Sequence, residues 1–66
     1  MTKEIVELLE YHINLYRYLN QTENYLKQEN EKFQQIQLEL YHKELKKLIT
    51  KIEKIITNRI SNNSNE

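Results

Sequence analysis

The chain has no cysteine, no glycine and no proline among its 66 residues. Without cysteine it can form neither a disulfide nor a thiolate metal site, and this absence is typical of a reducing compartment. Without glycine and proline it lacks the residues that punctuate strands and tight turns. The abundant residues, Lys, Glu, Gln, Leu and Ile, favour helix. The composition therefore predicts an all-α fold.

The chain also lacks the parts of the common catalytic sites. It has no aspartate, and its only serines are Ser61 and Ser64. Nucleophilic catalysis, an oxyanion hole and a phosphate-binding loop are therefore not supported. Two histidines far apart in sequence, His12 and His42, are a poor basis for a metal site, which needs three or four ligands. We expect a protein that is not an enzyme and that uses no cofactor or metal.

Long apolar runs are missing as well. No run approaches the roughly 18 residues that a membrane-spanning helix needs. Glu4, Glu7 and Glu10 interrupt the apolar residues near the start, whereas the hydrophobic region of a secretory signal is uncharged. We expect a cytoplasmic protein without a membrane partner.

Two apolar rows run side by side along the first part of the chain. The first follows alternating steps of three and four residues: Ile5, Leu8, His12, Leu15 and Leu19. The second repeats these steps one residue later: Val6, Leu9, Ile13 and Tyr16. The rows lie about 100° apart around a helix, so they predict contacts with two different neighbours.

The second part of the chain predicts a partner helix. Its apolar residues form a heptad row: Leu38, Tyr41, Leu45, Leu48, Ile52 and Ile55. Antiparallel pairing of the two rows sets Ile5 against Ile55 and Leu15 against Leu45. We therefore expect a two-helix hairpin over residues 1–60, followed by a disordered polar tail, 61–66.

The expected helices span about 3–28 and 32–60, and the expected turn lies near 28–31. Thr2 is the predicted N-cap of the first helix. Asn30 is the predicted pivot of the turn, because asparagine tolerates the left-handed conformation and can cap the next helix. The alternative is one continuous helix of roughly 85 Å in a parallel coiled coil. The polar stretch 20–32 argues against it.

A lone two-helix hairpin has only one internal line of contact, so the second row would face water. Chains this short usually need a disulfide, a metal or association to be stable. A homodimer that forms a four-helix bundle would bury the surplus. The expected interface comprises the second row and two flanking residues of the second helix: Val6, Leu9, Ile13, Tyr16, Ile49 and Ile56. The same face could instead dock on a different protein.

Two further groups are candidates for binding a partner protein. The first forms a short row out of phase with the main heptad: Phe33, Ile36 and Leu40. It either fills the end of a bundle or forms an exposed patch. The second group follows a seven-residue spacing: Tyr11, Tyr18 and Tyr25. These tyrosines either flank the core with their hydroxyls in water or form a recognition surface, where tyrosine is enriched.

Charge is unevenly spread along the chain. Residues 1–42 hold four Lys and Arg against seven Glu, a net of −3, whereas residues 43–60 hold six against two, a net of +4. One basic cluster accounts for most of the second value: Lys43, Lys46, Lys47, Lys51 and Lys54. It is either a solvated face or a contact for an acidic protein surface or a nucleic-acid backbone. A net charge of zero argues against general nucleic-acid binding.

Residues 42–49 resemble a motif in the second helix of short hairpin phosphatases that act on a sporulation response regulator. That motif reads Ser-Gln-Glu-Leu-Asp-x-Leu-Ile. The match keeps four positions: Glu44, Leu45, Leu48 and Ile49. Lys46 replaces the aspartate, and His42 and Lys43 replace the serine and glutamine. Even a true relative with these replacements would have lost the phosphatase activity.

These features favour a small regulatory or inhibitory protein that binds another protein through helical apolar faces. The abundance of Ile, Lys, Asn and Tyr suits an AT-rich bacterial genome, a phage or another mobile element. Two alternatives remain open. One is a nucleic-acid-binding plasmid or phage regulator that uses the lysine face, and the other is a structural assembly subunit.

Overall fold

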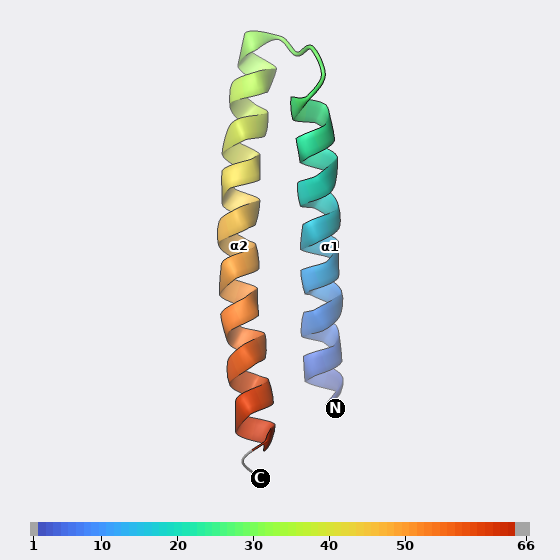
Figure 1. The fold of residues 1–66 in the computed structure, drawn as a ribbon, viewed down its shortest axis with the longest axis vertical. Helices are drawn as coiled ribbons and strands as arrows, with labels where there is room; N and C mark the ends of the chain where they lie inside the picture. The colour runs from blue at the N-terminus through green and yellow to red at the C-terminus, as the bar shows by residue number, and fades with distance from the viewer. Residues whose placement is uncertain (1, 65–66) are drawn as a thin grey trace.

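The computed structural model describes residues 2–64 and shows a hairpin of two antiparallel helices. Helix α1 spans Lys3–Leu26 and helix α2 spans Lys32–Ser64 (Figure 1). The two helices pack against each other along a molecule that measures 53 × 15 × 13 Å. The predicted hairpin is confirmed, and the continuous helix is excluded.

The start of α1 follows from the side chain of Thr2. Its backbone is extended, with φ −76° and ψ 157°, and its hydroxyl accepts a hydrogen bond from the Ile5 N–H at 3.3 Å. The Val6 N–H donates to the carbonyl of Thr2 at 3.1 Å. Glu4 places a negative charge in the first turn, where the helix dipole favours it. The predicted N-cap is confirmed.

The turn depends on the side chain of Asn30. Its amide donates to the carbonyl of Tyr25 at 2.7 Å and to that of Gln28 at 3.0 Å. The Tyr25 carbonyl also accepts from the Gln28 N–H at 3.1 Å, so the Asn30 amide adds a second donor there and supplies one to the Gln28 carbonyl in the turn. No residue among those described adopts a positive φ. The pivot lies where the sequence predicts it, but the expected left-handed conformation is wrong, because side-chain hydrogen bonds stabilise the turn instead.

The core lies along one line between the helices, which we call the internal seam. In α1 this seam contains the predicted row, and it continues through Thr22, whose hydroxyl donates to the Tyr18 carbonyl at 2.8 Å. The central cluster consists of Leu15, Leu19, Leu45 and Ile49, with Ile52 packed against it. A single cluster of this size explains why the molecule is a narrow rod.

The row that α2 contributes differs from the predicted one. The buried and half-buried residues of α2 are Gln35, Leu38, His42, Leu45, Ile49, Ile52 and Ile56. Ile49 and Ile56 are only 4% and 8% exposed, so they belong to the internal seam and not to an outer interface. The side chains expected in their place, those of Tyr41, Leu48 and Ile55, are exposed. This part of the prediction is wrong, because two α2 rows share Leu38, Leu45 and Ile52 and the packing selects the one that contains His42.

The C-terminal end of α2 also differs from expectation. The helix continues to Ser64, beyond the expected end at residue 60. No glycine or proline interrupts it, so each further residue adds a backbone hydrogen bond to a helix that already exists. The last two residues of the predicted tail, 65–66, lie outside the described residues.

The internal seam predicts opposite outcomes for two isoleucines. Replacing Ile49 by alanine should lower the free energy of unfolding by about 2–4 kcal/mol, since it leaves a cavity among Leu15, Leu19 and Leu45. The matched change Ile13→Ala, at a site 57% exposed, should alter it by less than about 0.5 kcal/mol. Urea denaturation followed by circular dichroism measures both. Equal effects would place Ile49 outside the core.

The turn offers a second test. Asn30→Ala should lower the free energy of unfolding by about 1 kcal/mol, because it leaves the carbonyls of Tyr25 and Gln28 without this side-chain donor. Glu29→Ala, next to it and exposed, is the control and should leave stability unchanged. If the two variants melt alike, the Asn30 side chain does not stabilise the turn.

Candidate interaction surfaces

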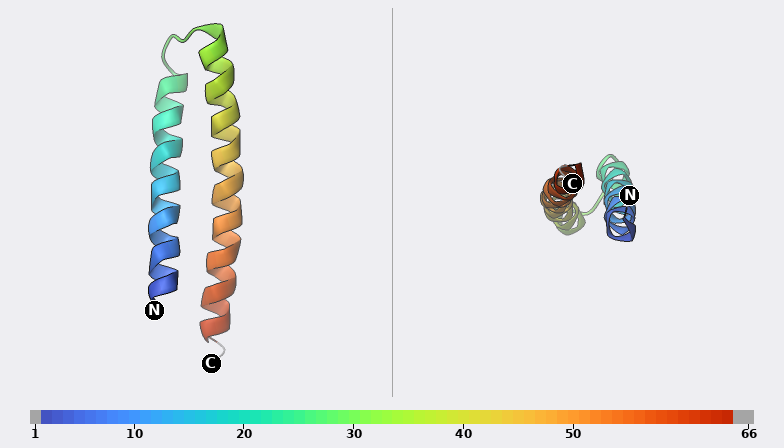
Figure 2. Two further views of the ribbon diagram at one scale, coloured as in Figure 1. Left: turned by 180° about the vertical axis from the view of Figure 1, so that it is seen from behind. Right: turned by 90° about the horizontal axis from the view of Figure 1, so that it is seen from below.

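The hairpin is a single layer, so two broad faces of the helix pair are open (Figure 2). Within the described part of the chain, six hydrophobic residues are buried and thirteen large hydrophobic residues are exposed. The exposed ones are not scattered evenly. They gather into the surfaces defined below by their positions around the two helices.

Polar contacts across the internal seam establish the register of the helices. His12 Nε2 lies 3.1 Å from Glu53 Oε2, and the Tyr16 hydroxyl donates to the same oxygen at 3.4 Å. Toward the turn, His42 Nε2 lies 3.2 Å from Glu23 Oε1. Compared with the expected pairing, α2 is displaced by about one helical turn.

Glu4 and Arg59 pair at the open end of the hairpin, which agrees with this register. All of these carboxylates are substantially exposed, so each pair adds little stability on its own. These ion pairs instead define the register, because they show which residues of α1 and α2 lie at the same height along the hairpin.

One face carries exposed apolar side chains from both helices, and we call it the groove face. It comprises Tyr11, Tyr18 and Tyr25 of α1 and Tyr41, Leu48 and Ile55 of α2, which are between 39% and 55% exposed. Four of them line one shallow groove between the helices: Tyr11, Tyr18, Tyr41 and Leu48. Ile55 follows Leu48 by one heptad and continues the α2 row. The α2 half was missed in the sequence because its residues were assigned to the core.

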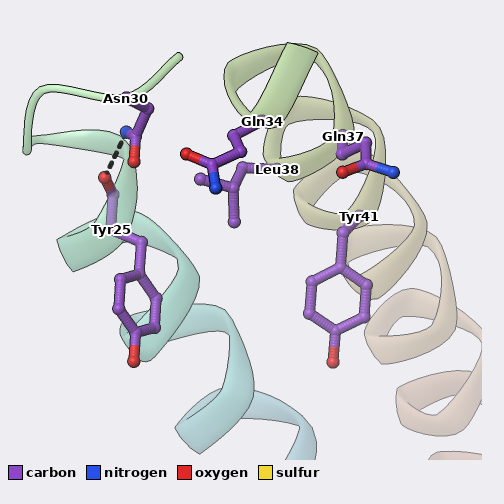
Figure 3. Close-up of a pocket in the computed structure, with 6 residues that line it drawn as sticks. All are labelled: Tyr25, Asn30, Gln34, Gln37, Leu38 and Tyr41. Atoms are coloured by element: carbon purple, nitrogen blue, oxygen red, sulfur yellow. Dashed lines mark hydrogen bonds between the residues drawn. The ribbon is translucent and has the colours of Figure 1, made fainter.

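The groove face continues to the turn (Figure 3). Tyr25 and Tyr41 lie on opposite sides of a second hollow, with Leu38 between them. The amides of Gln34 and Gln37 and that of Asn30 complete its lining. Tyr41 borders both hollows, so the face is continuous along the hairpin.

Charged residues of opposite sign flank the groove face. Glu7 and Glu10 lie along its α1 edge, where both line the groove. Lys51 follows Leu48 by three residues along the α2 edge, whereas Lys54 lies one heptad after Lys47 on the outer side and lines a separate hollow with Glu53 and Thr57. Glu7, Glu10 and Lys51 have no ion-pair partner within the part of the chain that the structure describes. The α1 edge is therefore acidic and the α2 edge is basic near the open end.

The surface expected as the dimer interface lies on the opposite face. Val6, Ile13 and Tyr16 are exposed there, while Leu9 is half-buried. The ring of Tyr16 packs edge-on against His12, with centroids 4.9 Å apart, and its hydroxyl is already bonded to Glu53. Ile49 and Ile56 are buried in the internal seam. The apolar area that α2 contributes to this face is therefore smaller than the sequence predicts.

The third surface lies on the first turns of α2, and we call it the turn-end patch. It consists of Phe33, Ile36 and Leu40, which are 69%, 47% and 59% exposed. Leu40 stands two residues after Leu38 of the internal seam, which is about half a turn around the helix, so it points away from α1. All five lysines of the predicted basic face are exposed, and Lys43 and Lys47 continue the same outer side of α2.

Within the described range, no three histidine, cysteine, aspartate or glutamate side chains lie close enough to bind a metal ion together. Neither helix, as far as it is described, has an apolar stretch long enough to cross a bilayer.

Comparison with protein-family models, curated proteins and solved structures finds no match for this chain. The likeness to the hairpin phosphatases thus stays a similarity of eight residues, 42–49. In the structure, its first residue, His42, lies in the internal seam beside Glu23.

Proposed function

We propose that this chain is a small, non-enzymatic regulator or inhibitor that acts by binding another protein through its turn-end patch. The supporting observation is the exposure of Phe33, Ile36 and Leu40 together on the outer side of α2. A patch of this kind marks an interaction site when it is contiguous. Burying it would contribute roughly 25 cal/mol for each Å² of apolar area removed from water.

The surroundings of the patch suggest the chemistry of the partner. Lys43 and Lys47 continue the spacing of Ile36 and Leu40 along the same helical side. A complementary partner would therefore offer an apolar contact followed by acidic groups. Such charges increase the association rate and the specificity more than the affinity.

Two other functions fit the patch less well. Nucleic-acid binding would use the five lysines of the basic cluster. It would leave Phe33 and Leu40 in water, because both precede these lysines along α2. A subunit that only assembles with itself would not need a separate patch on the outer side of α2. We keep a cytoplasmic location and an origin in a mobile element as parts of the proposal, on the basis of composition alone.

The proposal predicts selective loss of binding. A tagged protein should retain one stoichiometric partner from an extract of its host, and Phe33→Glu and Leu40→Glu should each reduce the retained amount at least about tenfold, because a charge at a buried contact is costly. Lys43→Glu should weaken binding more at low salt than at high salt. Mass spectrometry of the retained protein measures each effect.

The control is Ile13→Glu, an equally exposed apolar site on α1, which should retain the partner. Circular dichroism should show the same helicity in all variants. Binding that survives the changes at Phe33 and Leu40 would contradict the proposal. Retention of nucleic acid alone, lost with the lysine variant and with added salt, would favour the alternative function.

A further inference from the structure

We propose that the groove face binds a second copy of this chain, with α1 of each copy on α2 of the other and the symmetry axis parallel to the helices. This inference does not depend on the turn-end patch, which lies on the outer side of α2. It assigns a homodimer to a face other than the row of Val6, Leu9, Ile13 and Tyr16.

On the groove face, each residue of α1 has a partner in α2 at the same height along the helix axes. Because His12 contacts Glu53 in the antiparallel hairpin, the preceding residue, Tyr11, is level with residue 54 and thus close to Ile55. The contact between Glu23 and His42 likewise places residues 18 and 25 level with 47 and 40. The face therefore consists of three layers: Tyr11 with Ile55, Tyr18 with Leu48, and Tyr25 with Tyr41.

The groove faces of two copies are complementary in shape. A twofold symmetry axis parallel to the helices places Tyr11 over Ile55 of the copy and Tyr18 over its Leu48. In those two layers each aromatic ring then meets an aliphatic side chain, so large and small side chains alternate as in packed cores. An axis perpendicular to the helices would instead place Tyr18 over Tyr18 of the copy.

Charge favours the same axis. Glu10 is two residues before His12 and Lys51 is two residues before Glu53, so both stand toward the open end, about one helical turn apart in level. With the parallel axis, the acidic edge of one copy, Glu7 and Glu10, lies along the α2 edge of the other, which carries Lys51. With the perpendicular axis, the acidic edge would lie near the turn of the copy, where Lys27 and Lys32 are accompanied by Glu29 and Glu31.

The available area is sufficient for a dimer. Six side chains of this size, about half exposed, offer roughly 500 Å² per copy, or about 1,000 Å² in the pair, close to the lower limit for a specific interface. We therefore expect a dissociation constant in the micromolar range, about 1–100 µM.

Sedimentation velocity over a concentration series tests the dimer and its face. The unmodified chain should be a dimer at high concentration. Leu48→Lys should raise the dissociation constant at least about a hundredfold, because it places a charge inside the interface. Ile13→Lys, the matched change on the opposite face, should leave it within about threefold. Circular dichroism checks that both variants keep their helices.

A charge-reversal pair tests the orientation without touching any apolar contact. One variant carries Glu10→Lys, and the other carries Lys51→Glu. Each alone should dimerise about tenfold more weakly, since like charges then face each other. An equimolar mixture should recover dimers, because both edges of the mixed pair are complementary again.

Three results would overturn the inference. The first is a monomer at all concentrations up to about 1 mM. The second is a dimer that Ile13→Lys dissociates and Leu48→Lys does not. The third is a mixture of the two charge variants that dimerises no better than either alone. None of these results bears on Phe33 and Leu40, so the proposed function would fail or stand separately.

Discussion

The packing of Leu15 and Leu19 against Leu45 and Ile49 is the interaction on which the rest of this structure depends. It is the only hydrophobic cluster formed by the buried residues that the structure describes. Since two helices meet along one line, the residues that occupy this line decide which residues remain outside. The entry of His42, Ile49 and Ile56 into the seam leaves Tyr41, Leu48 and Ile55 on the surface, beside the tyrosines of α1.

This exposure follows from the size of the chain. Two helices in one layer cannot cover both of their faces, and small domains bury a smaller share of their surface than large ones. The groove face and the turn-end patch lie on different sides of α2, so a second copy and another protein could bind together. The acidic and basic edges near the open end would then orient the copies, while the lysines on the outer side would face the partner.

The hairpin, the N-cap at Thr2, the position of the turn and the α1 row could be predicted from the sequence, because each depends on local pattern. The α2 row could not. Tyr41 and His42 belong to two equally regular heptad rows of α2. Hydrophobicity favours the row with Tyr41, whereas the structure buries the row with His42. Only the helix across the seam distinguishes them, since it places Glu23 beside His42. The spacing of the three tyrosines of α1 indicates a candidate surface in the sequence. The α2 half of the groove face does not stand out, because its residues fit the predicted core heptad.

The most direct test of this account is the solvent accessibility of side-chain methyl groups, measured by NMR with a soluble paramagnetic probe at several protein concentrations. The account predicts that Ile49 and Ile56 are protected at every concentration, and that Leu48 and Ile55 are accessible when dilute and protected when concentrated. Accessible Ile49 and Ile56 beside permanently protected Leu48 and Ile55 would show that the other α2 row forms the core. That result would contradict both the seam described for this hairpin and the groove face that follows from it.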